Sequence, residues 1–229
     1  MPIKRITLIS TSLVTGALMN KLFAKEFPGV LIHNIIDDSL VKEIIANGDV
    51  IPPGVIQRVT SHVISAEISG SDLVVITCSS ISAIARIGER LVKIPVLRID
   101  EPMAEWAVKK GERIKVLATI SATLTPTLHL LQEKAQEIGK KIILDSSLCQ
   151  TARKFLDEGN PQEHDRILRE EIERALKDFD IVVLAQASMA RVLDSLEAKN
   201  REFILTSPSL AIREIRRRFF TRRIRGDFR

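Results

Sequence analysis

Runs of apolar residues that end in small polar residues recur along the chain, and one such run occurs twice. Residues 72–82 read DLVVITCSSIS and residues 180–190 read DIVVLAQASMA. Each run begins with an acid, continues with four apolar residues typical of a buried parallel strand, and ends in a polar cluster. At an offset of 108 positions, Gln186 aligns with Cys78. The pattern predicts one strand in two copies, with a different side chain at the end of each.

The same offset aligns further blocks of the chain. RITLIST from Arg5 aligns with RIKVLAT from Arg113, residues 94–111 align with 202–219, and IIDDSL (35–40) aligns with ILDSSL (143–148), which equates Asp37 with Asp145. A constant offset over separate blocks indicates an internal duplication. We therefore predict a first half formed by residues 1–100 together with the C-terminal segment 206–229, and a second half formed by residues 101–205.

Within each half, the pattern predicts strands that alternate with helices. The first strands are expected at Ile6–Ile9 and Ile114–Leu117, and the second strands at Val30–Ile36 and Lys141–Leu144. Asn160 is expected to cap a helix whose apolar face carries Leu168, Ile172 and Leu176. The residues of EPMAEWAV (101–108) are expected to pack as a helix. Alternating strands and helices predict an α/β fold of two pseudo-symmetric halves, each a parallel sheet flanked by helices.

Polar residues follow the strands at the positions where ligands bind in such folds. Ligands of open parallel sheets lie beyond the carboxyl ends of the strands, and helix N-termini there favour anions. Two halves facing each other would form a cleft suited to a small carboxylate. The expected substrate-binding residues are Ser10, Thr11, Ser12, Ser79, Ser80, Thr119, Ser121, Gln186, Ala187 and Ser188.

Cys78 is the candidate catalytic residue. Ser79 and Ser80 are expected to begin a helix directly after it, and the N-terminus of a helix stabilises a thiolate that can act as a base or nucleophile. The alternative is a small buried core residue, the common fate of a free cysteine. The offset aligns Cys149 with Val41, which favours core packing for the second cysteine.

These residues resemble the aspartate/glutamate/hydantoin racemase superfamily. VVITCSS and VVLAQAS resemble its two cysteine motifs, and RIKVLAT resembles its threonine-bearing central strand. The resemblance implies proton exchange at the carbon next to a carboxylate or carbonyl of a small acid. It also implies that the enzyme needs no cofactor or metal and forms a homo-oligomer, commonly a dimer.

The chain departs from that resemblance at three positions. Gln186 stands where the second catalytic cysteine is expected, Ser79 where asparagine is frequent, and Ser10 where a glutamate racemase has an acid. Glutamine has no proton that titrates near neutral pH. The open alternatives are a racemase-like isomerase, a lyase or tautomerase with a single cysteine resembling arylmalonate decarboxylase, and a non-catalytic protein that binds a small acid.

Composition narrows the partners. Aromatic residues make up 4% of the chain and tyrosine is absent, which argues against a base-stacking nucleic-acid surface. Two cysteines without metal-ligand spacing favour a reducing compartment, and no apolar stretch is long enough for a membrane span. We therefore expect a cytoplasmic protein. Eight arginines and two acids follow residue 206. The alternatives for this basic end are binding of phosphates or anionic lipid, a solvated helix face, and contact with an acidic patch of a second subunit.

Overall fold

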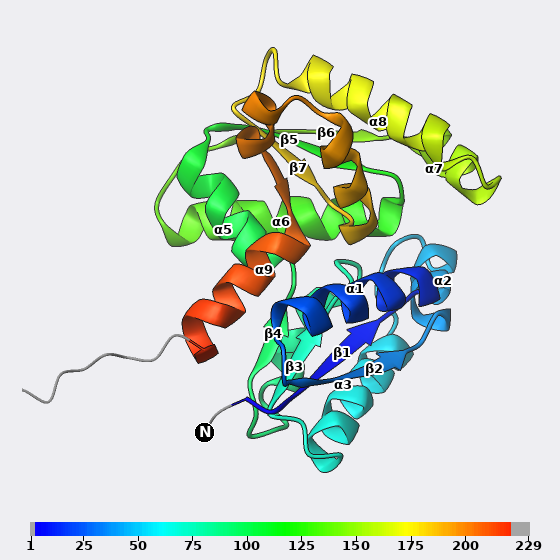
Figure 1. The fold of residues 1–229 in the computed structure, drawn as a ribbon, viewed down its shortest axis with the longest axis vertical. Coiled ribbons are helices and arrows are strands. Elements are labelled where there is room, and N and C mark those ends of the chain that lie inside the picture. The colour runs from blue at the N-terminus through cyan, green and yellow to red at the C-terminus, as the bar shows by residue number, and fades with distance from the viewer. Residues whose placement is uncertain (1–2, 221–229) are drawn as a thin grey trace, which may run out of the picture.

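The structure is a computed structural model, and it describes residues 3–220. It contains two four-stranded parallel sheets with the same strand order, which confirms the predicted fold class (Figure 1). The first sheet has the order β2-β1-β3-β4 and the second the order β6-β5-β7-β8. The strands are β1 (Arg5–Ser10), β2 (Leu31–Ile36), β3 (Leu73–Ile76), β4 (Val96–Arg98), β5 (Arg113–Ala118), β6 (Ile143–Leu148), β7 (Ile181–Leu184) and β8 (Ile204–Thr206).

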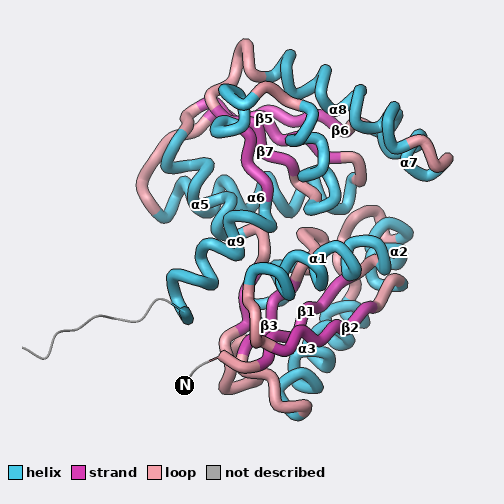
Figure 2. Tube along the Cα trace, viewed as in Figure 1, coloured by secondary structure: helices cyan, strands magenta, loops and turns pink. Residues whose placement is uncertain are grey.

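Helices connect the strands and cover both faces of each sheet, as Figure 2 shows for α1 and α3 around the first sheet. The first half contains α1 (Leu13–Glu26), α2 (Ser39–Ala46), α3 (Pro53–Ile68), η1 (Ser82–Ile84) and α4 (Ala85–Gly88). After them come α5 (Glu101–Lys110), α6 (Ser121–Glu137), α7 (Gln150–Asp157), α8 (Pro161–Ala175), η2 (Ala187–Ser195), η3 (Ala198–Phe203), α9 (Ser207–Ile215) and η4 (Arg216–Phe220). No helix within residues 3–220 is long and apolar enough to cross a membrane.

The repeated apolar runs form the centre of each half because both faces of their strands are buried. In β3, Val74 and Ile76 belong to the core on the α3 face, whereas Leu73 and Val75 belong to the core on the α1 face. Alternation along a strand sends successive side chains to opposite faces. A strand covered on both faces therefore needs the continuous apolar run that the sequence contains.

The acid that opens each copy of the run has a structural role. The Asp72 carboxylate accepts hydrogen bonds from the backbone N–H groups of Arg5 and the residue before it (2.9 and 2.8 Å). Asp180 accepts the equivalent two bonds at the start of β5, from Arg113 and the residue before it (both 2.9 Å). These backbone bonds hold the pKa of Asp180 below its usual value. The repeated acid thus ties the beginning of the central strand to its neighbour in both halves.

Two helices cross between the halves. α5 follows the last strand of the first sheet, yet Met103 and Ala107 lie in the core of the second half beside Ile114 of β5. α9 follows the last strand of the second sheet, and Ile212 and its neighbours lie in the core of the first half. Figure 1 shows α9 descending from the second half toward the first. The exchange buries apolar surface of each helix in the opposite half, which fixes the halves relative to each other.

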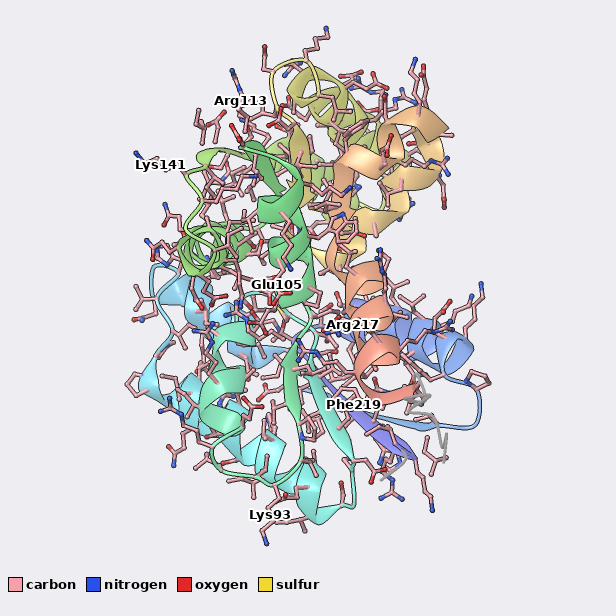
Figure 3. The ribbon with its side chains drawn as sticks, turned by 90° about the vertical axis from the view of Figure 1, so that its left-hand side faces the viewer. Lys93, Glu105, Arg113, Lys141, Arg217 and Phe219 are labelled. Atoms are coloured by element: carbon pink, nitrogen blue, oxygen red, sulfur yellow. The ribbon has the colours of Figure 1, made fainter. Side chains whose placement is uncertain are left out.

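The described part of the basic end is held by contacts within the chain. Figure 3 labels Glu105 of α5 and Arg217 of η4, on the side of the molecule where α5 packs against α9. Arg222, Arg223, Arg225 and Arg229 lie outside the described residues. The contacts of the others include Arg213 over the Trp106 ring (4.6 Å), Arg216 with Glu26 (2.8 Å), and Arg217 with Glu214 (2.6 Å).

The expected equivalence of Asp37 and Asp145 is wrong. The last residue of β1 pairs with Ile36 and the last residue of β5 pairs with Leu148, so the second strands are offset by 112 positions. The reason is a longer α6: it has three more residues than α1, and the connection to β6 has one more. The counterpart of Asp37 is therefore Cys149, whereas Asp145 lies within β6. The second strand of this half is Ile143–Leu148 rather than Lys141–Leu144.

The helix that begins with Pro161 agrees with its predicted signals. The side chain of Asn160 accepts a hydrogen bond from the backbone N–H of Glu163 (3.2 Å), so the predicted cap is confirmed. Leu168 and Ile172 are buried, whereas Leu176 is only partly buried and lies at the end of the helix.

Candidate active site

One cavity of about 1030 Å³ lies between the halves, at the carboxyl ends of the central strands. Thr11 and Cys78 line it from the first half, and Thr119 and Gln186 line it from the second. Because the strands of each sheet are parallel, the residues after β1 and β3 emerge at one edge, as do those after β5 and β7. The duplicated run thus places Cys78 and Gln186 in the same cavity, as the repeat predicts.

The sulfur of Cys78 is held by two hydroxyl groups. Thr11 Oγ1 donates a hydrogen bond to the sulfur (2.9 Å), and Ser80 Oγ lies 3.1 Å from it. Cys78 is partly exposed, whereas Thr11 and Ser80 are buried. Buried hydroxyl groups of this kind can donate hydrogen bonds to the sulfur when it carries negative charge.

Gln186 occupies the position of the second half that is equivalent to Cys78, and a threonine contacts it in the same way. Its Oε1 accepts hydrogen bonds from the backbone N–H (2.6 Å) and from Oγ1 (3.1 Å) of Thr119. Thr119 thus corresponds to Thr11 in position and in contact. These two hydrogen bonds orient the amide of Gln186 so that its oxygen points toward Thr119. No described residue accepts a hydrogen bond from the Nε2 group, which leaves this donor for a ligand in the cavity.

The remaining predicted residues divide into two groups. Ser12, Ser79, Ser121, Ala187 and Ser188 line the cavity with the residues above, whereas Ser10 and Ser80 do not. Ser10 lies behind the cavity, fully buried, with its Oγ 2.6 Å from Thr77 Oγ1. Ser79 Oγ donates to the carbonyl of Ala185 (3.0 Å), so this hydroxyl joins the loop after β3 to the end of β7.

Comparison with known proteins places the chain in a family. The family model for Asp/Glu/hydantoin racemase matches residues 6–214. The chain belongs to the Asp/Glu/hydantoin racemase family. No curated protein matches it significantly.

Solved structures show the fold of this family. An allantoin racemase from Klebsiella pneumoniae is 20% identical, with a TM-score of 0.68 over 93% of this chain and 86% of that one. A glutamate racemase from Thermus thermophilus is 17% identical, with a TM-score of 0.69 over 95% and 81% of the two chains. An aspartate racemase homologue from Pyrococcus horikoshii OT3 is 15% identical, with a TM-score of 0.67 over 93% and 97%.

In this family member, the segment after Cys78 differs from the expected helix. A turn is followed by the short 3₁₀ helix η1 and the four-residue α4, so Ser79 and Ser80 do not begin a long helix. Ile87 and Leu91, which follow in this segment, are 43% and 52% exposed.

A buried polar network holds this segment instead. Ser82 Oγ donates to Asp100 Oδ2 (2.7 Å), and Arg98 Nε donates to Asp100 Oδ1 (3.1 Å). All three residues are buried. Ser82 Oγ also lies 3.2 Å from the carbonyl oxygen of Ser79, next to Cys78. Fully satisfied buried networks specify one arrangement, so this network fixes the loop that carries the thiol.

The mouth of the cavity contains residues that sequence reasoning missed. The side chains come from the first turns of α1 and from α2 and α7, which flank the cavity. For the α7 residues, the 108-residue alignment gave the wrong register, because the second strands are offset by 112 positions. The residues at the mouth are Leu13, Val14, Asp38, Val41, Lys42, Ile45, Gln150, Arg153, Lys154, Asp157 and Glu158.

We expect iodoacetamide to label Cys78 about tenfold faster than Cys149, or more, near pH 7.5. Cys78 lines the cavity, whereas Cys149 is buried at the start of α7. Burial raises the pKa of the Cys149 thiol to about 11, which keeps it protonated at this pH. Peptide mass spectrometry over a time course measures both rates. Equal rates would remove the reason to place reactive chemistry at Cys78.

Proposed function

We propose that this chain catalyses cofactor-independent proton transfer at the carbon adjacent to a carboxylate or carbonyl of a small acid. Cys78 is the proposed acid and base. The observation that carries the proposal is the thiol within the cavity between the halves, held by Thr11 and opposed in the repeat by Gln186. Membership of the racemase family supports the same class of chemistry.

The proposed step begins with the Cys78 thiolate. The sulfur takes the α-proton, the C–H bond breaks, and its electron pair moves into the carboxylate or carbonyl group to form an enediolate or enolate. The S–H bond that forms then returns a proton to the carbon. Negative charge develops on the substrate oxygens, so donors aimed at these oxygens lower the barrier.

Gln186 is proposed as one of these donors. Its Oε1 is engaged by Thr119, so the Nε2 group can donate to a substrate oxygen. The amide has no proton that titrates near neutral pH, so it cannot deliver one to the second face of the planar intermediate. Proton exchange is therefore proposed to occur on the Cys78 face alone.

A lyase with the same cysteine is the second candidate, and Gln186 is the observation that favours it. In a decarboxylation, the bond between the α-carbon and a carboxylate breaks, carbon dioxide leaves, and the electron pair stays on the substrate as an enediolate. The Cys78 thiol then protonates the carbon. This sequence needs one titratable group beside the reacting carbon, and Cys78 is proposed for that role.

The proposal is tested by deuterium exchange. Single enantiomers of glutamate, aspartate, 2-phenylpropionate and 5-benzylhydantoin are incubated with the protein in D₂O. We expect at least one of these compounds to lose its α-proton signal in the NMR spectrum. Chiral chromatography measures how fast the opposite enantiomer forms, and we expect this inversion to be at least about tenfold slower than the loss of the α-proton signal. Fast inversion would contradict the one-face mechanism. Release of carbon dioxide from a substituted malonate, without exchange of any monoacid, would favour the lyase.

A further inference from the structure

The two walls at the mouth of the cavity differ at equivalent positions of the repeat. α2 presents Val41 and Ile45 to the cavity, one helical turn apart. At the 112-residue offset, their counterparts on α7 are Arg153 and Asp157, which also line the cavity. Arg153 and Asp157 form a two-point ion pair (2.7 and 2.8 Å). One wall therefore has an apolar pair where the other has an ion pair.

The first turns of α1 and α6 also differ in polarity, and again the first half is the more apolar. Leu13 and Val14 line the cavity from α1 and are 70% and 75% exposed. At the 108-residue offset, their counterparts are Ser121 and Ala122, which are polar and small. Together with Val41 and Ile45, Leu13 and Val14 form an apolar wall on the first half. This wall is continuous with the cavity that holds Cys78.

The cations that line the cavity are already paired. Lys42 contacts Asp38 (2.7 Å), Arg153 contacts Asp157, and Lys154 lies 3.9 Å from Glu158. Each of these described cations has its carboxylate partner one turn away on its own helix. A second carboxylate, as in glutamate, would compete with these acids for the same cations. An apolar substituent meets Leu13, Val14 and Ile45 without displacing a charge.

We infer that the ligand of this cavity is a carboxylic acid whose other substituent is apolar, either aryl or branched alkyl. The inference rests on the proposed function of the same cavity. The carboxylate lies near Cys78 and the Nε2 group of Gln186, and the apolar substituent lies on the wall formed by α1 and α2. Burial of an apolar group of this size strengthens binding by about tenfold or more.

Protection of Cys78 from iodoacetamide measures occupancy of the cavity. Phenylacetate and glutamate serve as probes because they have the same number of non-hydrogen atoms. We expect phenylacetate to halve the alkylation rate at a concentration at least about tenfold below that of glutamate. Equal protection by the two acids, or stronger protection by glutamate, would overturn the inference.

A matched pair of variants locates the apolar contact. Ile45→Asp changes the 47% exposed side chain on the cavity wall, and Ile68→Asp changes an 80% exposed side chain at the end of α3, outside the cavity lining. We expect Ile45→Asp to raise the protecting concentration of phenylacetate about tenfold, with Ile68→Asp unchanged. Equal effects of the two variants would contradict the proposed wall.

Two further readouts separate the remaining outcomes. If Ile45→Asp dissociates an oligomer in light scattering but leaves protection unchanged, the wall is an interface between copies and the inference is overturned. Protection requires no turnover, so strong protection by phenylacetate without deuterium exchange would support the inference while contradicting the proposed function. Exchange of the α-proton of glutamate, with no protection by phenylacetate, would support the proposed function and contradict the inference.

Discussion

Replacing Cys78 with serine is expected to lower the rate of α-proton exchange by about 10²–10⁴-fold, the range contributed by one positioned acid or base. A serine hydroxyl is a far weaker acid than a thiol, so it neither holds the negative charge at neutral pH nor returns a proton with the same ease. The side chain remains of similar size, so the contacts from Thr11 and Ser80 can persist. NMR in D₂O, with an acid that the unaltered protein exchanges, measures the loss.

Cys149→Ala is the matched control because it removes the other cysteine of the chain, which does not line the cavity. It is expected to retain exchange near the original rate. Thermal unfolding of both variants shows whether each remains folded. A folded Cys78→Ser protein that exchanges protons at the original rate would require a different base.

The fold was predictable because three of the four strands in each half keep a constant spacing. β1 and β5, β3 and β7, and β4 and β8 each begin 108 residues apart, and all are short and buried in covered parallel sheets. An insertion within such a strand would send the residues that follow it to the opposite face of the sheet. Because these strands have the same spacing in both halves, the duplication can be recognised from a single sequence.

The register of the second strands was not predictable from the same alignment. β2 and β6 are edge strands whose residues are exposed or only partly buried, so their apolar pattern is weak. The chance similarity of IIDDSL and ILDSSL concealed four added residues before β6. Helix length and loop length at the surface change without cost to the core, which is why an offset read from buried strands failed there.

The candidate site was predictable in position but not in hydrogen bonding. Polar residues after parallel strands must emerge at one edge, and this placed Thr11, Cys78, Thr119 and Gln186 in one cavity. The hydroxyl of Ser79, for example, donates a hydrogen bond to the carbonyl of Ala185, which is 106 residues away in the other half. No local pattern encodes such a contact, because it arises only when the halves pack together.

Gln186→Cys is expected to raise the rate of inversion at least about tenfold, a modest part of the gain that a positioned acid can supply. The variant places a thiol at the repeat position equivalent to Cys78. Thr119 Oγ1 already contacts the Gln186 side chain, as Thr11 Oγ1 contacts Cys78, so a hydroxyl partner for the new sulfur is present. After Cys78 removes the α-proton, the introduced thiol can deliver a proton to the opposite face.

Gln186→Ser separates the new acid from the lost amide. Both variants remove the Nε2 donor, but serine adds no group that titrates near neutral pH, so its inversion rate is expected to stay at the original level or below. Chiral chromatography in D₂O reports inversion, and NMR reports exchange on the same samples. Inversion that rises equally in both variants would mean that water reaches the second face once glutamine is removed. A folded Gln186→Cys protein whose exchange persists without any inversion would show that the second half does not face the reacting carbon.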